Sequence, residues 1–191
     1  MKNDARICGQ HLRLLAAMCL AAVAATGCGL MRDPGMSPAL AGSPVGMSPA
    51  DQAFATMAAG SGRYQVGVSR LAVRRAVNPQ VKAYAQMLVD HHTTANKELM
   101  QLLSTRGMTP PSAIPPDKEE ETQRLSGLTG AEFDRQFVRG VGLDDHALDI
   151  ALFDRESRDG FDSGLRAWAT KMLPTLRWHL QAAQALQRAM R

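Results

Sequence analysis

The chain has 191 residues, with 22 Lys and Arg against 18 Asp and Glu, three cysteines and 5% aromatic residues. A net charge of +4 with so few aromatic side chains argues against the basic, aromatic-rich surface typical of nucleic-acid binding, so we expect no nucleic-acid partner. Cys8, Cys19 and Cys28 all stand near the N-terminus, so a domain formed by the rest of the chain has no disulfide, thiolate ligand or cysteine nucleophile.

The N-terminal segment predicts export from the cytoplasm. A basic leader precedes residues 14–25, which are almost all Leu, Ala, Met and Val. This run of 12 residues is too short to span a bilayer but suits the apolar part of a signal peptide. Small residues follow, and the sequence Ala-Thr-Gly-Cys that ends at Cys28 resembles a bacterial lipobox.

We therefore expect residues 1–27 to be a signal peptide and Cys28 to be lipidated, with ordinary signal cleavage as the alternative. The signal peptide predicts a location on the periplasmic side of the envelope. Because Gly29 is not Asp, we expect the lipid to hold the protein in the outer membrane. The sequence indicates no protein partner. Residues 28–47 are rich in Pro, Gly and Ser and predict a flexible tether. Without the signal peptide, 19 basic and 17 acidic residues give a net charge of +2.

Residues 48–191 predict a domain of four long helices, because apolar side chains recur at spacings of three and four. Ser48, Asn78 and Asp162 are the expected N-caps of the first, second and fourth helices. Thr129 and Glu132 are expected to form a capping box on the third helix. The predicted helices cover about residues 49–77, 79–106, 129–159 and 162 to near the C-terminus.

The connections predict how these helices are arranged. The first and third connections are tight, so each joins an antiparallel hairpin. The second connection is long, with four prolines in residues 109–116 and a short acidic helix over residues 117–125. We expect an all-α, ferritin-like four-helix bundle with a long helix 2 to helix 3 connection; an up-down bundle with a decorated loop is the alternative.

A polar layer is predicted at the middle of the bundle. At about 100° per residue, Gln65 and His92 fall within the apolar stripes of their helices, and His91 lies on the flank of one. Asp144 and His179 interrupt the stripes of the third and fourth helices. Each of these residues lies near the middle of its helix, so we expect all four helices to contribute to one level.

His146 has two interpretations. On the expected stripe of the third helix it points with Phe153 away from the core, as a surface or crossover-packing residue. If that helix is rotated, His146 turns inward, Asp144 turns outward, and Asp145 and Asp149 become neighbours of His146.

Two hypotheses explain the polar layer. His91, His92, Asp144, His146 and His179 could hold a single divalent transition metal, because imidazole and carboxylate are ligands of zinc, iron, manganese and copper. Alternatively, these side chains form a closed hydrogen-bond network that fixes the helix register. A ferritin-type di-iron centre is excluded, because it needs Glu-x-x-His on two helices and no carboxylate stands three residues before any of these histidines.

Four short motifs of the predicted helices are Asp90-His91 after Met87, Phe133-Asp134, Asp145-His146, and Leu173-Pro174-Thr175-Leu176 followed by His179-Leu180. Together they resemble the bacterial domain-of-unknown-function family 4142 over about residues 51–186. The resemblance implies a ferritin-like fold in secreted or envelope proteins, with no established activity. It implies that His91, His146 and His179 are the family's histidines, leaves His92 as an extra one, and places Gln65 where members often have Glu.

We therefore expect an envelope lipoprotein with a non-enzymatic role, as a binding or stress-related structural module without a catalytic residue. The alternative is a periplasmic metal-binding or metal-dependent redox protein that uses the polar layer.

Overall fold

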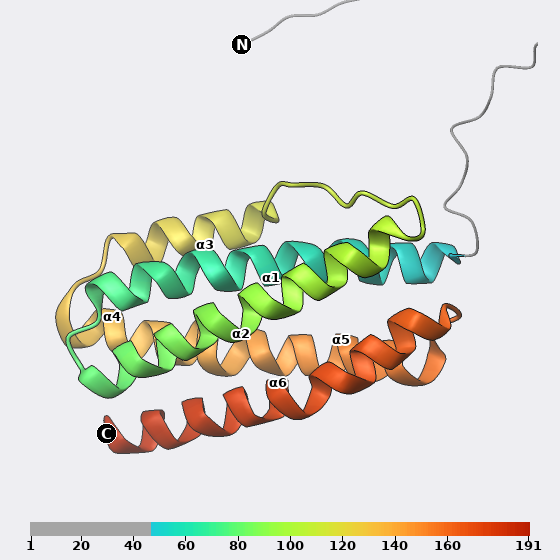
Figure 1. Ribbon diagram of the computed structural model, residues 1–191. Helices are drawn as coiled ribbons and strands as arrows, with labels where there is room; N and C mark the ends of the chain where they lie inside the picture. Colours follow the sequence, from blue (N-terminus) through green and yellow to red (C-terminus); the bar gives the residue numbers. More distant parts are fainter. Residues whose placement is uncertain (1–46) are drawn as a thin grey trace, which may run out of the picture. The chain divides into compact units, whose positions relative to one another are not determined.

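A computed structural model describes the chain from residue 47 to the C-terminus. Over this range every regular element is a helix and no strand occurs, which confirms the expected all-α class (Figure 1). The predicted signal peptide, the lipidated Cys28 and the tether up to residue 46 lie outside the described residues. The elements are α1 (Pro49–Arg75), α2 (Pro79–Ser104), α3 (Pro116–Ser126), α4 (Gly130–Phe137), the π-helix η1 (Val138–Asp145), α5 (His146–Asp159) and α6 (Ser163–Ala189).

The predicted caps fix most of the helix starts. Ser48 and Asp51 form a reciprocal capping box on α1, and the side chains of Asn78 and Asp162 accept hydrogen bonds from the first turns of α2 and α6. The capping box expected at Thr129 is wrong, because that side chain makes no cap hydrogen bond. Glu132 instead accepts hydrogen bonds from Arg135 and Gln136 further along its own helix.

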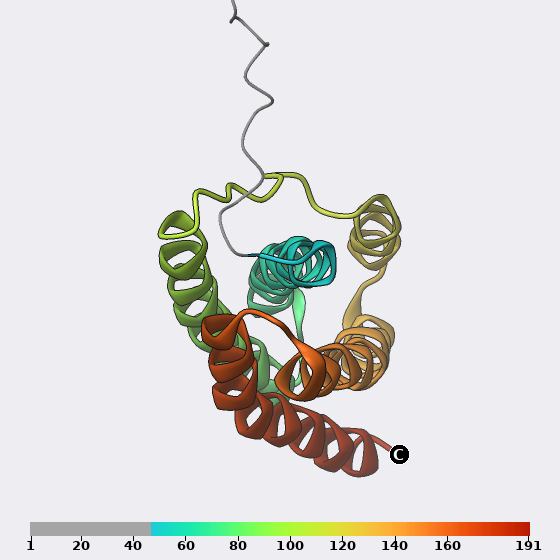
Figure 2. The same cartoon turned by 90° about the vertical axis from the view of Figure 1, so that its right-hand side faces the viewer.

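The order and direction of the helices match the expected crossover arrangement. α1 packs against α2, and α5 packs against α6, each as an antiparallel hairpin. Figure 1 shows that α2 and α5 run in the same direction, because the chain returns along the bundle through residues 105–115, α3 and α4 before α5 begins. Figure 2 shows α3 on the opposite side of α1 from α2.

Two hydrophobic clusters form the core, one toward each end of the bundle. The first includes Val68, Leu88 and Phe137, and the second includes Phe54, Leu99 and Trp168. Along α2, the segment η1–α5 and α6, the residues between the two clusters include the buried His92, His146, Asp149 and His179. Gln65 of α1 is also buried, but it lies between two residues of the first cluster. The core is therefore divided by a buried polar layer.

The third long helix is not one regular α-helix. Eight residues, Val138–Asp145, form a π-helix between α4 and α5. A π-helix has i→i+5 hydrogen bonds, so it holds extra residues and turns the following side chains around the axis by about 100° for each extra residue. As a result Phe153 is buried, whereas Leu148, which the regular stripe placed inside, is 66% exposed.

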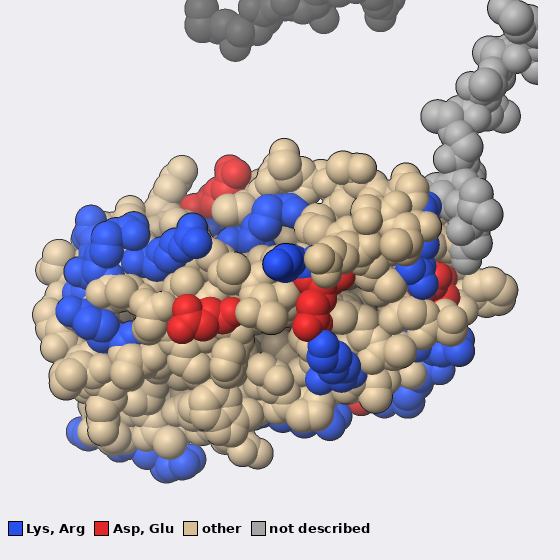
Figure 3. Space-filling view, viewed as in Figure 1, with Lys and Arg blue, Asp and Glu red and all other residues tan. Residues whose placement is uncertain are grey.

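Arginines cluster where helices end. Arg74 and Arg75 lie in the last turn of α1, and Arg124 and Arg135 lie in the last turns of α3 and α4. Figure 3 shows Lys and Arg side chains gathered over this end of the molecule. Cations near helix C-termini are favourable, because the helix dipole is negative there.

Within residues 47–191, none of the helices is both long enough and apolar enough to cross a bilayer.

Candidate functional site

Three buried histidines from three helices converge in the polar layer. His92 of α2, His146 of α5 and His179 of α6 each present one ring nitrogen, and these nitrogens all lie within 4.8 Å of one another. Nε2 of His146 lies 3.1 Å from Nδ1 of His179 and 3.4 Å from Nε2 of His92. The burial predicted for His92 and His179 is confirmed, since they are 6% and 1% exposed.

The π-helix decides which residue of the third long helix joins this group. It places His146 inside with no exposed surface, and it leaves Asp144 on the outside. The expectation that Asp144 belongs to the polar layer is wrong, because that expectation assumed about 100° per residue without interruption. The rotated alternative is the observed one, and Asp145 and Asp149 are both buried near His146 in the sequence.

The remote nitrogens of two of the histidines have partners. Nδ1 of His146 lies 2.8 Å from the carbonyl oxygen of Val141, and a carbonyl only accepts, so this nitrogen carries the proton. The lone pair of His146 therefore lies on Nε2, toward His92 and His179. Nε2 of His179 lies 2.8 Å from Nδ1 of His91, whose ring stacks on that of His179 with centroids 5.1 Å apart.

His91 thus lies beside the cluster rather than in it. Its ring is on the more exposed flank of α2, as the sequence indicates, and it also contacts the ring of Trp178, with centroids 5.9 Å apart. The resemblance ranked His91 above His92, but the structure brings His92 into the group of three and leaves His91 as a partner of His179.

Burial keeps the cluster neutral. It lowers the pKa of His146 to about 4, and together with the neighbouring imidazoles it lowers the pKa of His179 to about 3. Burial and the same neighbours hold the pKa of His92 well below its ordinary value. Neutral imidazoles with free lone pairs are the form that binds metal ions.

Two carboxylates on the same long helix as His146, those of Asp145 and Asp149, are also buried. Asp145 pairs with Lys118 of α3, which also lies 3.2 Å from Glu121. The two carboxylate oxygens of Asp149 each accept a hydrogen bond from Oγ of Ser61 at 2.9 Å. Lys118 carried no signal in the sequence, whereas Ser61 could have been found as a small polar residue on the apolar stripe of the first helix.

Gln65 is buried in α1, as the sequence predicts. Its side-chain oxygen and nitrogen make no hydrogen bond with any residue of the described part of the chain. The structure therefore gives Gln65 no contact that would make it a member of the histidine cluster.

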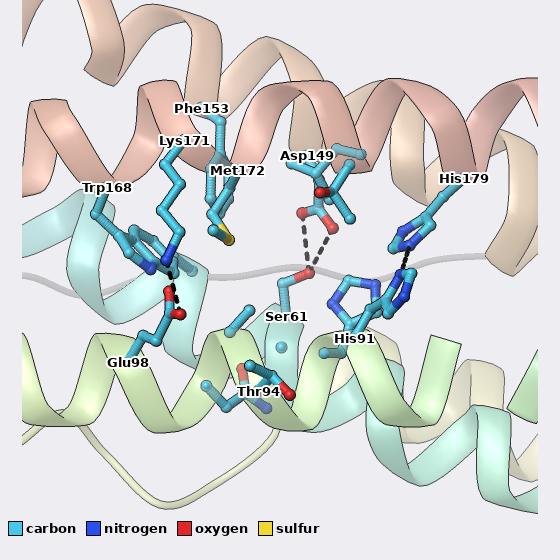
Figure 4. Close-up of a pocket in the computed structure, with 17 residues that line it drawn as sticks. Ser61, His91, Thr94, Glu98, Asp149, Phe153, Trp168, Lys171, Met172 and His179 are labelled. Atoms are coloured by element: carbon cyan, nitrogen blue, oxygen red, sulfur yellow. Dashed lines mark hydrogen bonds and ion pairs between the residues drawn. The ribbon is translucent and has the colours of Figure 1, made fainter. Parts of the chain in front are cut away.

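A cavity of about 260 Å³ adjoins the cluster, and Figure 4 shows the side chains that line it. His91, His92 and His179 line one part of it, and Phe153, Trp168 and Met172 line another. Asp149 and Ser61 also line the cavity. The cavity therefore reaches His92 and His179 of the cluster, whereas His146 is not part of its lining.

Comparisons with known proteins identify relatives of the bundle. The solved structures that resemble it include a DUF305 fragment from Deinococcus radiodurans, with a TM-score of 0.67 and 16% identity over 75% of this chain and 98% of that chain. They also include a DUF305 protein from Streptomyces coelicolor, with a TM-score of 0.54 and 13% identity over 74% of this chain and 88% of that chain. At these identities the likeness shows a shared helical fold.

The search of curated proteins found no match. The scan of protein families matches residues 36–186 to the domain of unknown function DUF4142. That match covers well over half of the chain and agrees with the resemblance carried by the histidine and Leu-Pro motifs. The chain therefore belongs to the DUF4142 family.

Proposed function

We propose that this protein is a metal-binding module of the bacterial envelope, which holds one zinc or copper ion between His92, His146 and His179. The spacing of the ring nitrogens carries the proposal. A tetrahedral zinc ion with Zn–N bonds of about 2.0–2.1 Å sets its nitrogen ligands roughly 3.3–3.4 Å apart. Two of the three separations, 3.1 Å and 3.4 Å around Nε2 of His146, are close to that value, and all three ring nitrogens lie within 4.8 Å of one another.

The contacts behind the ring nitrogens support the same proposal. Metal-binding histidines usually donate their other N–H to a carbonyl, a carboxylate or water, which fixes the tautomer and the ring orientation. The carbonyl of Val141 does this for His146. Nδ1 of His91 would do it for His179, whose Nε2–H would donate when Nδ1 binds the ion.

The donor set indicates which ions would bind. The three side chains whose donor atoms lie together are all imidazoles. Imidazoles suit zinc and copper, whereas magnesium and calcium need oxygen ligands. Three protein ligands leave a fourth position, as in catalytic rather than structural zinc sites. The adjoining cavity gives an external ligand room to reach that position.

A structural network is the second candidate function, because His91, His179 and His146 can form a hydrogen-bond chain that ends on the carbonyl of Val141 without an ion. Nδ1–H of His91 can donate to His179, and Nδ1–H of His179 can donate to Nε2 of His146. Such a layer fixes helix register, and replacing it with apolar residues is often neutral or stabilising.

A metal analysis combined with thermal melts separates the two candidates. The protein is purified from its native compartment for elemental analysis, then stripped with chelator and melted with and without zinc, copper or manganese. We expect a rise in Tm with zinc or copper for wild type and for the control Asp144→Asn, and no rise for His92→Leu/His179→Leu. Absence of a shift with every metal, with a higher Tm for the double variant in chelator, would establish the structural network instead.

The proposed location rests on the N-terminal sequence. The basic leader, the apolar run of residues 14–25 and the small residues before Cys28 support a lipid anchor. Two acyl chains give stable membrane attachment where one chain gives only reversible binding. We expect labelled palmitate to enter the wild-type protein, and we expect Cys28→Ser to yield a form released from membranes. A wild-type protein that never takes up the label would contradict the anchor.

A further inference from the structure

The cavity beside the histidine cluster contains a carboxylate that the metal site does not use. Its lining comes from α1, α2, α5 and α6. In Figure 4, Trp168 and Phe153 lie toward one side, His91 and His179 toward the other, and Asp149 with Ser61 between them. We propose that this cavity binds a small primary amine with an apolar body, whose ammonium group pairs with Asp149. The proposal is independent of metal binding.

In the described part of the chain, Asp149 has no cationic partner. Among residues 47–191, no Lys, Arg or His nitrogen forms an ion pair with it, and its only hydrogen-bond donor is Oγ of Ser61. Asp149 is 8% exposed, so water supplies little compensation for a negative charge. An uncompensated buried charge is costly, so a cation that reaches the carboxylate from the cavity would be bound favourably.

The surroundings of Asp149 explain why no cation of the described residues neutralises its carboxylate. Lys118 is the cation that acts on it from α3, but that side chain already pairs with Asp145 and Glu121. Asp145 of η1 adds a like charge. Burial is the largest influence and raises the pKa of Asp149 to about 7, and the Ser61 hydrogen bond opposes it. A bound ammonium group would supply the missing opposite charge.

The walls of the cavity favour an organic cation over a bare metal ion. Asp149 is not among the three residues whose donor atoms lie together. Phe153, Trp168 and Met172 offer apolar and aromatic surface, which stabilises an apolar body by about 25 cal/mol per Å² buried and attracts a nearby cation to the ring faces. A volume of 260 Å³ has room for about nine water-sized groups at ~30 Å³ each, which suits a small arylalkylamine.

Two further polar groups on the cavity wall have no hydrogen-bond partner among residues 47–191. Nε1–H of Trp168 and Oε2 of Glu98 are buried and make no hydrogen bond within the described part of the chain. The other oxygen of Glu98 pairs with Lys171 at 2.7 Å. A hydroxyl group both accepts and donates, so a ligand that ends in one would have a use for either group. Tyramine, a phenolic arylalkylamine, therefore serves as a second probe beside phenethylamine.

Calorimetric titration of the chelator-treated protein at pH 8 tests the proposal. The probes are phenethylamine, tyramine and 2-phenylethanol, the last being a neutral analogue of nearly the same shape. We expect both amines to bind wild type at least tenfold more tightly than the alcohol does. We expect Asp149→Asn to lose at least tenfold in amine affinity, while Asp144→Asn, an exposed neighbour with the same change in charge, keeps the wild-type affinity.

Each other outcome overturns the proposal. Equal affinity for amine and alcohol would show an apolar cavity without a role for the carboxylate, and no binding of either amine would show no such site. Full amine affinity in Asp149→Asn would place the ammonium group elsewhere. The comparison of amine with alcohol needs only wild type, so it decides the question even if Asp149→Asn does not fold. Because no metal is present, these results are separate from those of the metal titration.

Discussion

Nε2 of His146 in α5 lies 3.1 Å from Nδ1 of His179 in α6, across the last hairpin. The π-helix that ends at Asp145 makes this contact possible, because it turns His146 into the bundle at the point where α5 begins. The carbonyl of Val141, inside the π-helix, then holds the remote nitrogen of the same ring. The π-helix therefore both places His146 and fixes its tautomer.

Replacing His91 tests whether the partner of a proposed metal ligand, His179, contributes to metal affinity. His91→Phe keeps an aromatic ring beside Trp178 and His179 but removes the nitrogen that lies 2.8 Å from Nε2 of His179. We expect zinc or copper affinity to fall by about 10- to 100-fold, because partners of this kind orient the ligand without binding the ion. Competition with a chelator measures the change. An unaltered affinity would mean that His91 has no part in the site.

The pH dependence of stability tests the burial of His146. Its pKa is about 4 in the folded, metal-free protein and about 6.5 when unfolded, so between these values the unfolded chain takes up the proton first. The free energy of unfolding should therefore fall as pH is lowered from about 6.5 to 4, by on the order of 3 kcal/mol from this group. Metal should also be released at a lower pH than the ordinary pKa of histidine would suggest.

Other groups oppose this trend, so the measurement needs a matched variant. Burial raises the pKa of Asp149 to about 7, so the stability associated with its protonated form is present at low pH and is lost as pH rises through that value. The slope for His146→Gln isolates the histidine, since glutamine does not titrate in this range. Urea melts at several pH values should give a shallower dependence for the variant than for wild type. Identical slopes would show that His146 titrates normally.

The ion pair between Lys118 and Asp145 connects α3 to the π-helix η1. Lys118→Met leaves the carboxylate of Asp145, whose side chain is 6% exposed, without its cation. We expect a loss of about 1–3 kcal/mol in the free energy of unfolding, discounted because Lys118 is partly exposed. Lys171→Met is the matched control; its pair with Glu98 is more exposed and should contribute less than about 1 kcal/mol. Asp145→Asn added to Lys118→Met should recover part of the loss.

Two glycine substitutions test the packing of the π-helix. A Cβ atom at Gly142 would lie 2.8 Å from Cβ of Ala183 and 3.4 Å from the hydroxyl of Tyr84, so α6 has no room for it. We expect Gly142→Ala to cost about 1–3 kcal/mol through overpacking. At Gly67, an exposed position within α1, a Cβ meets nothing within 4 Å. Gly67→Ala should instead stabilise by up to about 1 kcal/mol. Chemical denaturation measures both, and equal effects would contradict the close approach at Gly142.

The sequence by itself determined the features that depend on neighbouring residues. Ser48, Asn78 and Asp162 cap their helices because each side chain reaches backbone groups two or three residues away. His92 and His179 lie inside because their helices keep the regular period that places them on the apolar stripe. The two antiparallel hairpins followed from their tight connections, whereas the long second connection was compatible with both a crossover and an up-down bundle.

The tertiary structure alone decided the third long helix and therefore the composition of the site. No local sequence pattern predicts the π-helix. A regular α-helix with about 100° per residue therefore placed Asp144 and Leu148 inside the bundle and left two interpretations of His146 open. Packing of Gly142 against Ala183, the pairing of Asp145 with Lys118 from a distant helix, and burial of Phe153 are contacts between segments far apart in the chain. The change in helix phase of about 100° for each extra residue goes together with these contacts, and the pattern of neighbouring residues does not contain them.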